Sequence, residues 1–137
     1  MRTAAFAEFQ AIAAFRWAAE RFTDAPEGLR QAWREQVADE ELHYRIIIER
    51  MAELGIEVDA RPVSPRIWQS VRACTRGREF CILIAGAEER GRRAGLQLIA
   101  ALGGRDPATA AVFQRIVDDE VAHVELARTY YGWTPPA

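Results

Sequence analysis

Apolar residues recur at spacings of three and four along most of the chain, which is the period of an amphipathic α-helix. The pattern covers four long segments, which are Ala5 to Phe22, Leu29 to Leu54, Phe80 to Leu102 and Phe113 to Tyr130. With their flanking residues they predict helices over about 3–22, 25–54, 78–102 and 107–131. The sequence therefore predicts an all-α fold built from four long helices.

Turn-forming residues separate the first predicted helix from the second and the third from the fourth. The stretch "TDAPE" at 23–27 offers Asp24 as an N-cap, with Glu27 three residues later. The stretch "GGRDPAT" at 103–109 ends one helix with two glycines and begins the next with Asp106 and Pro107. Because both connections are short, each pair of helices is predicted to form an antiparallel hairpin.

A longer connection, about 55–77, joins the two hairpins and carries one expected short helix around 67–73. A connection of this length inside a compact domain needs a structural reason. A crossover along the bundle is such a reason, because it lets the second and third long helices run parallel. At about 3.3 Å per extended residue, a dozen residues span a helix of about 25 residues. We therefore predict a single domain over 1–137.

Composition narrows the classes of function. The chain of 137 residues has a formal charge of −2, which gives no strong electrostatic footprint for nucleic acid. No apolar run is long enough to cross a bilayer, and the N-terminus lacks the layout of a secretory signal. We expect a soluble, cytoplasmic protein without a membrane partner. Cys74 and Cys81 match no zinc pattern and are interpreted as ordinary buried thiols.

The two histidines of the chain occupy matching positions in "ADEELHYR" (38–45) and "DDEVAHVE" (118–125). Each follows a glutamate by three residues, a pair that on its own is typical of a solvated helix surface. Here the two pairs interrupt stripes that are otherwise apolar. The stripes are Leu29, Trp33, Val37, Glu40, His43, Ile47, Leu54 and Phe113, Ile116, Glu120, His123, Ala127, Tyr130. Both pairs are therefore predicted to face the core, where an unpaired carboxylate costs several kcal/mol.

Two further glutamates fit the same positions. Glu8 lies 32 residues before Glu40, and Glu88 lies 32 residues before Glu120. The midpoints of these intervals, residues 24 and 104, fall in the two predicted turns. In each antiparallel hairpin the two glutamates are thus predicted to lie at the same height, on the buried face.

Four glutamates and two histidines converging in a helical bundle are typical of a dinuclear metal site. Two nearby divalent cations repel each other, and bridging carboxylates offset that repulsion. One Glu from each of two helices and one Glu-x-x-His from each of the other two is a known way for a bundle to supply the ligands. Oxygen-rich ligands with one imidazole per metal favour iron or manganese over structural zinc. We predict two iron ions, with manganese or a mixed Mn/Fe pair as the alternative.

The six predicted ligands divide by role. Glu40 and Glu120 are expected to bridge the metals, Glu8 and Glu88 to be terminal, and His43 and His123 to bind one metal each. Asp39 and Asp119 are candidate acceptors for the imidazole N–H groups, which would fix the tautomer and orientation of each ring. The alternative for these two aspartates is solvation at the helix surface.

Access to the site is predicted beside Glu88. Gly91 and Gly95 lie on the ligand stripe of the third long helix, opposite Phe113 and Ile116, and their missing side chains leave room for a pocket. Close packing of two helices explains the glycines equally well. Phe15 and Trp33 fill the equivalent space in the first hairpin, so a pocket is expected on one side only.

The motifs "DEELH", "EERG" and "DDEVAH" resemble those of the ferritin-like di-iron carboxylate superfamily. Together with "EFQAIAAFRWAAERFTDAPEGLR" they are similar to a bacterial branch of short ferritin-like domains of largely uncharacterised function, and more distantly to the tRNA hydroxylase MiaE. The resemblance covers nearly the whole chain. It implies a ferritin-like four-helix bundle, two antiparallel hairpins joined by a long crossover, and chemistry with O2 or peroxide.

Three functions follow from this resemblance. The first is an oxygenase or oxidase that oxidises or hydroxylates a small molecule and takes electrons from a donor protein. The second is a ferroxidase that handles iron within a homo-oligomer. The third is an RNA-modifying hydroxylase, whose phosphate contacts would come from arginines on helices. These arginines are Arg66, Arg72, Arg76 and Arg78, or Arg90, Arg92 and Arg93.

Overall fold

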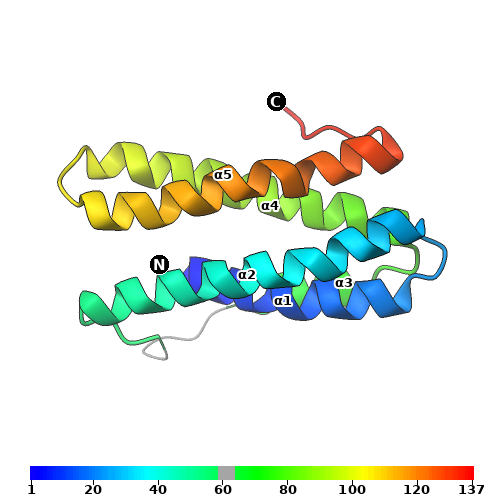
Figure 1. Ribbon diagram of the computed structural model, residues 1–137, viewed down its shortest axis with the longest axis horizontal. Coiled ribbons are helices and arrows are strands. Elements are labelled where there is room, and N and C mark those ends of the chain that lie inside the picture. Colours follow the sequence, from blue (N-terminus) through cyan, green and yellow to red (C-terminus); the bar gives the residue numbers. More distant parts are fainter. Residues whose placement is uncertain (59–63) are drawn as a thin grey trace. The chain divides into compact units, whose positions relative to one another are not determined.

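The computed structural model describes residues 1–58 and 64–137 (Figure 1). All regular secondary structure among these residues is helical. The helices are α1 (Arg2–Arg21), α2 (Glu27–Glu53), α3 (Arg66–Arg72), α4 (Gly77–Leu102) and α5 (Pro107–Tyr131). The all-α prediction is confirmed, and each long helix begins and ends within about two residues of its predicted range. The predicted crossover contains α3, while residues 59–63 of that segment lie outside the described residues.

The chain comprises two compact units, Met1–Leu83 and Ile84–Ala137. The first contains α1, α2, α3 and the beginning of α4, and the second contains the rest of α4 and all of α5. The division thus falls inside a continuous helix. Among the described residues no helix is both long and apolar enough to span a membrane.

Aromatic residues form the core of the first unit. Phe80 contacts three rings, with centroid distances of 5.9 Å to Phe15, 5.8 Å to Phe22 and 5.0 Å to Trp33. All four side chains are at most 1% exposed. Large rings in edge-to-face contact bury much apolar area and add a directional term to the packing energy. This cluster fixes α1 and α2 against the beginning of α4.

The short helix α3 is attached to α1 by a buried glutamine. Gln10 accepts a hydrogen bond from the backbone N–H of Trp68 at 3.0 Å and donates to the Ser64 carbonyl oxygen at 3.5 Å. The Trp68 ring packs edge-on against Trp17 at 6.0 Å. A polar side chain thus holds the end of the long connection onto α1.

Asp24 caps a different helix from the one predicted. Helix α2 has Pro26 at its N-cap and no side-chain cap, so the expected capping box is wrong. The Asp24 carboxylate instead accepts a hydrogen bond at 3.0 Å from the backbone N–H of Gly77, the first residue of α4. A Cβ at Gly77 would lie 2.8 Å from the Ala25 Cβ. Glycine is needed here because the turn between α1 and α2 approaches the backbone closely.

The second unit follows its predicted turn chemistry. Gly103 and Gly104 adopt positive φ angles of 55° and 81°, a conformation that ends α4 without the strain a side chain would add. The Asp106 carboxylate accepts a hydrogen bond at 3.1 Å from the Thr109 backbone N–H and caps α5, with proline in the first turn. Helices α4 and α5 therefore form a hairpin with a short connection.

Candidate metal centre

One face of α2 is buried along its whole length, and it carries the first Glu-x-x-His pair. Its buried residues are Leu29, Trp33, Gln36, Glu40, His43, Ile47 and Met51. Two positions of the predicted stripe are wrong, since Gln36 is buried rather than Val37 and Met51 rather than Leu54. The spacings of three and four that place Glu40 and His43 inward also select Gln36, one turn earlier. A search for apolar residues alone misses it because it is polar.

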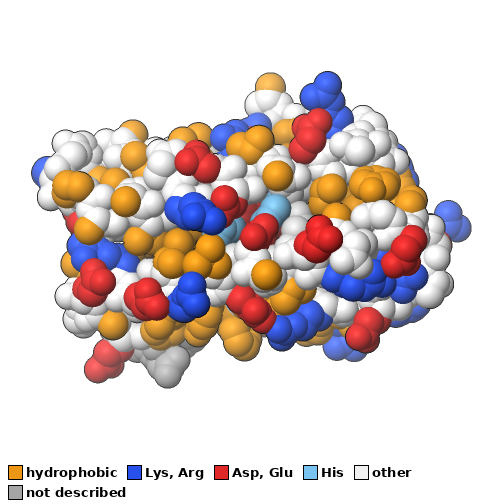
Figure 2. Space-filling view, viewed as in Figure 1, with side chains coloured by type: hydrophobic (Ala, Val, Ile, Leu, Met, Phe, Trp, Pro, Cys, Tyr) orange, Lys and Arg blue, Asp and Glu red, His pale blue; other side chains and the backbone are white. Residues whose placement is uncertain are grey.

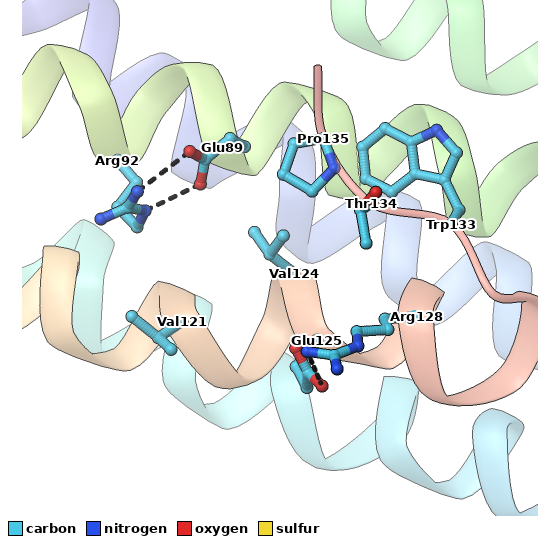
Figure 3. Close-up of a pocket in the computed structure, with 9 residues that line it drawn as sticks. All are labelled: Glu89, Arg92, Val121, Val124, Glu125, Arg128, Trp133, Thr134 and Pro135. Atoms are coloured by element: carbon cyan, nitrogen blue, oxygen red, sulfur yellow. Dashed lines mark hydrogen bonds and ion pairs between the residues drawn. The ribbon is translucent and has the colours of Figure 1, made fainter. Parts of the chain in front are cut away.

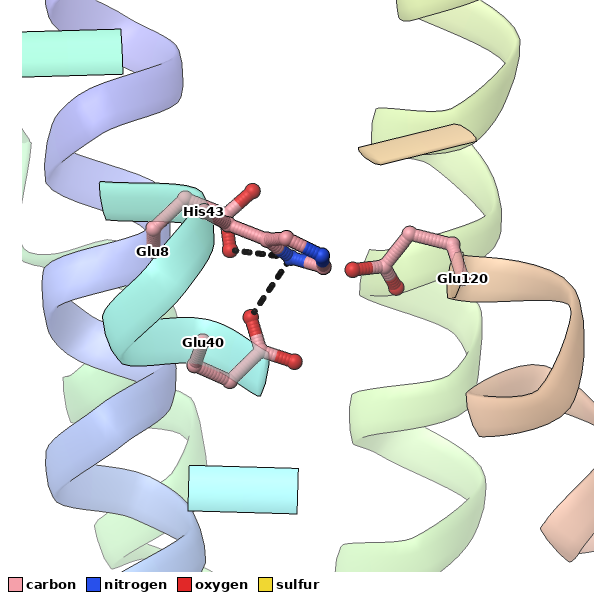
Figure 4. Close-up of side chains that lie close together, drawn as sticks. All are labelled: Glu8, Glu40, His43 and Glu120. Carbon is pink, nitrogen blue, oxygen red and sulfur yellow. Dashed lines mark ion pairs between the residues drawn. The ribbon is translucent and has the colours of Figure 1, made fainter. Parts of the chain in front are cut away.

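Glu8, Glu40 and His43 form the first ligand cluster, within the first unit (Figure 4). One ligand atom from each of the three lies within 4.8 Å of the other two. The His43 Nδ1 atom is 3.7 Å from Glu8 Oε2 and 3.6 Å from Glu40 Oε2. Glu40 and His43 are at most 1% exposed. The prediction that α1 and α2 bring these three residues together is confirmed.

Glu88, Glu120 and His123 form the second ligand cluster, within the second unit. The His123 Nδ1 atom lies 3.6 Å from Glu88 Oε1 and 3.6 Å from Glu120 Oε2. All three side chains are buried. Each residue follows its counterpart in the first cluster by 80 positions. Two hairpins of different sequence thus hold the same three groups in the same relation.

These separations fit ligands that share one metal ion. At 3.6–3.7 Å an imidazole nitrogen and a carboxylate oxygen are too far apart for a hydrogen bond. Two ligands bonded to one ion at about 2.1 Å stand about 3.0–3.6 Å apart when their angle at the metal is between a right angle and 120°. The observed distances of 3.6–3.7 Å lie at or just above the upper end of that range.

Charge balance also favours a divalent cation in each cluster. Two ionised carboxylates side by side in a buried setting repel each other and lose their hydration. A protonated imidazole balances only one of the two charges. A divalent cation balances both and leaves the imidazole neutral, which is the form that binds metals. The donors in each cluster are carboxylate oxygens and one imidazole nitrogen, which are groups that bind divalent metal ions.

The aspartates that precede Glu40 and Glu120 lie at the margin of the buried faces. Asp39 is half-buried, and the side chain of Asp119 is 24% exposed. Asp119 accepts a hydrogen bond from Arg115 Nε at 2.8 Å. Their role as acceptors for the histidine N–H groups stays a prediction.

The glycines of the predicted pocket differ in their surroundings. A Cβ at Gly95 would stand 2.8 Å from Val117 Cγ2, so this glycine permits close packing of α4 and α5. A Cβ at Gly91 would meet nothing within 4 Å, and Gly91 is exposed. Phe113 and Ile116 are buried. Close packing accounts for Gly95, whereas a pocket formed by the four residues stays a prediction.

A hollow of about 340 Å³ lies elsewhere in the second unit (Figure 3). It is lined by Glu89, Arg92, Val121, Val124, Glu125, Arg128, Trp133, Thr134 and Pro135. Glu89, Val121 and Val124 directly follow Glu88, Glu120 and His123, so they point to another face of their helices. None of the four predicted pocket residues lines this hollow.

Glu89 is the centre of an ion-pair network beside the hollow. Its carboxylate accepts hydrogen bonds from Arg92 at 2.7 and 2.9 Å and from Arg93 at 2.7 Å. The Arg92 hydrogen bond is the main cause that lowers the pKa of Glu89, and Arg93 adds to it. Arg93 also donates to the Pro136 carbonyl oxygen at 2.8 Å, which ties the C-terminal residues to α4.

Charged side chains of both signs are intermixed on the face of the molecule in Figure 2. Two arginines of the RNA-binding hypothesis, Arg92 and Arg93, already bind Glu89. Cys74 and Cys81 are buried, as predicted. Burial raises the pKa of the Cys74 thiol, so at neutral pH this group is neutral and a weak nucleophile.

Comparison with known proteins places the chain in a family without assigning an activity. Residues 1–135 match the family described as "Protein of unknown function (DUF455)", and the chain belongs to this family. Among curated proteins, none matches the chain.

Proposed function

We propose that the protein is a dinuclear metal carboxylate protein, with one metal ion at each ligand cluster. The observation that carries the proposal is the repetition of one Glu, Glu, His set in both hairpins, buried except for the partly exposed Glu8, with N–O separations of 3.6–3.7 Å. The proposal includes the ferritin-like arrangement of the four long helices in a single domain, and bridging of the two ions by Glu40 and Glu120.

Iron is the proposed metal, with manganese or a mixed pair as the alternative, and the proposed activity is oxidation or hydroxylation of a small molecule with O2 or peroxide. When bound, a pair of ferrous ions supplies the two electrons that such a reaction draws from the site, and an electron donor restores them. The protein supplies ligand geometry and burial. His43 and His123 would bind the ions as neutral imidazoles, and the apolar residues around them would exclude bulk water from the reacting groups.

Metal stoichiometry tests the proposal first. The protein is purified anaerobically, loaded with Fe(II), and analysed for metal per chain before O2 is added under optical detection. We expect two irons per chain and a transient charge-transfer band. Absence of metal, or a single tightly held zinc, would overturn the proposal.

Ligand variants sharpen this test. Glu40→Ala and Glu120→Ala are expected to abolish binding of both metals, because each removes a proposed bridge, whereas Glu8→Ala mainly weakens one. Glu49→Ala removes an exposed glutamate from the same helix as Glu40 and serves as the matched control. Unchanged stoichiometry in the Glu120 variant would contradict the ligand assignment.

The alternative functions give different outcomes in the same experiments. A ferroxidase within a homo-oligomer takes up many irons per chain as mineral, whereas an oxygenase stops at two and needs electrons. An RNA-modifying hydroxylase binds RNA at low salt and loses that binding as salt rises. Either result would replace the small-molecule assignment while keeping the metal centre.

A further inference from the structure

Gln36 lies beside the first ligand cluster on the buried face of α2. It precedes Glu40 by four residues, so the two side chains are neighbours on the helix surface. Helical side chains tilt toward the N-terminus, which directs the Glu40 carboxylate toward the turn that carries Gln36. Gln36 is 5% exposed, and it belongs to the same buried face of α2 as Glu40.

The Oε1 atom of Gln36 has no hydrogen-bond partner among the residues that the structure describes. A buried amide oxygen without a donor loses its hydration and gains nothing in return. Gln10 in the same unit provides the contrast. It is 6% exposed, yet its amide bonds to the backbone of Phe6, Ser64 and Trp68. The fold can thus provide hydrogen-bond partners for the amide of a buried glutamine. The Oε1 atom of Gln36 is therefore available to accept a hydrogen bond from a donor outside the protein.

The second unit shows that helix packing does not require a polar group at this position. The residue 80 positions after Gln36 is Ile116, which is buried and stands one turn before Glu120. An apolar side chain therefore fills the equivalent place beside the second ligand cluster. The glutamine needs an explanation from the chemistry of the first cluster.

We propose that Gln36 Oε1 accepts a hydrogen bond from a water molecule bound to the metal ion of the first ligand cluster. This inference rests on the proposed function. Four protein ligands, Glu8, His43 and the two proposed bridges, leave coordination positions open on a six-coordinate iron or manganese ion, and water fills such positions. Bound water is a donor, and the amide oxygen is an acceptor. Gln36 is then a positioning residue, and the two metal positions differ because Ile116 offers no acceptor.

The test uses Mn(II) as the probe and Gln36→Leu as the variant, which removes the amide at nearly constant volume. We expect a metal-free melting temperature no lower than that of the wild type, because an unsatisfied oxygen is removed. Mn(II) binding should weaken about three- to tenfold, as for one lost hydrogen bond. The deuterium signal of exchangeable bound water, recorded by pulsed EPR in heavy water, should shrink.

Gln10→Leu is the matched control, since it removes a buried glutamine whose partners are known. It should lower the metal-free melting temperature and leave Mn(II) affinity unchanged. Gln36→Glu retains an acceptor and should keep at least wild-type Mn(II) affinity, which keeps the test decisive if the leucine variant fails to fold.

Three outcomes would overturn the inference. Unchanged Mn(II) affinity and deuterium signal in Gln36→Leu would exclude the hydrogen bond while leaving the metal site intact. Loss of one whole metal equivalent would make Gln36 a direct ligand. A wild-type protein that binds no Mn(II) or Fe(II) would overturn both this inference and the proposed function.

Discussion

The two hairpins hold the same ligands in different surroundings. In the first unit Phe15 and Trp33 fill the core, with Phe80 between them. The positions 80 residues later are Gly95 and Phe113, and Gly95 instead allows Val117 of α5 to approach α4. Repetition of Glu, Glu and His is therefore not a by-product of repeated packing. The ligand positions agree where the packing does not, which favours a shared chemical role.

The largest expected effect on stability comes from removing the Trp33 ring from the aromatic core of the first unit. Trp33→Ala should lower the free energy of unfolding by about 3–5 kcal/mol, because the cavity left beside Phe80 cannot close fully. Denaturant unfolding of the metal-free protein measures this loss. Phe9→Ala, at an aromatic residue that is 55% exposed, is the control and should cost far less. Equal losses in both variants would contradict the aromatic core.

Gly95 tests the close packing that marks the second unit. Gly95→Ala should destabilise the protein by about 1–3 kcal/mol, since its Cβ would meet Val117 Cγ2 at 2.8 Å. Gly91→Ala should stabilise it by about 0.5–1 kcal/mol, because alanine is a better helix former and nothing obstructs it. Thermal unfolding of the pair gives the sign of each change. A stabilising Gly95→Ala would mean that α4 and α5 are not held this closely.

Glu89 gives the second unit a pH-dependent contribution. Its pKa is lowered in the folded state, so its stabilisation is present above the unfolded-state pKa near 4.5 and is lost as the pH falls through the lower folded value. Glu89→Gln should cost about 1–2 kcal/mol at neutral pH, discounted for the partial exposure of Arg92 and Arg93. Unfolding curves of wild type and variant should converge in acid.

The exposed pair of Arg16 and Glu41 in the first unit is the control for Glu89. Glu41→Gln should change stability little at any pH, since water and salt screen exposed ion pairs. A difference between Glu89→Gln and wild type that grows as the pH falls would reverse the assigned direction of the pKa shift.

The smallest expected effect concerns the turn of the second hairpin. Asp106→Ala should cost about 1 kcal/mol, because it leaves the Thr109 backbone N–H at the start of α5 without its acceptor. Asp106→Asn keeps an acceptor and should restore most of that stability. Chemical denaturation of both variants is sufficient, and equal losses would show that the hydrogen bond contributes nothing.

The sequence predicted most where local chemistry decides the structure. The helical period of the apolar residues and the turn-forming residues predicted the four long helices. The spacing of the ligand residues along these helices predicted that Glu8 lies near His43 and Glu88 near His123. Prediction failed where the structure depends on a contact between residues that are distant in sequence. Asp24 precedes α2 and looks like its cap, yet it bonds to Gly77, 53 residues away. Gln36 was missed because its burial follows from position on α2, while its polarity suggested solvent.

The hydrogen bond between Asp24 and Gly77 makes the start of α4 depend on the folded turn between α1 and α2. The first amide of α4 is held by the turn between α1 and α2, so this contact joins two groups that lie 53 residues apart in the sequence. In hydrogen exchange, the Gly77 amide should therefore exchange with the opening of the first hairpin rather than with fraying of its own helix end. A probe at the first residue of α4 should thus report the folding state of the hairpin formed by α1 and α2.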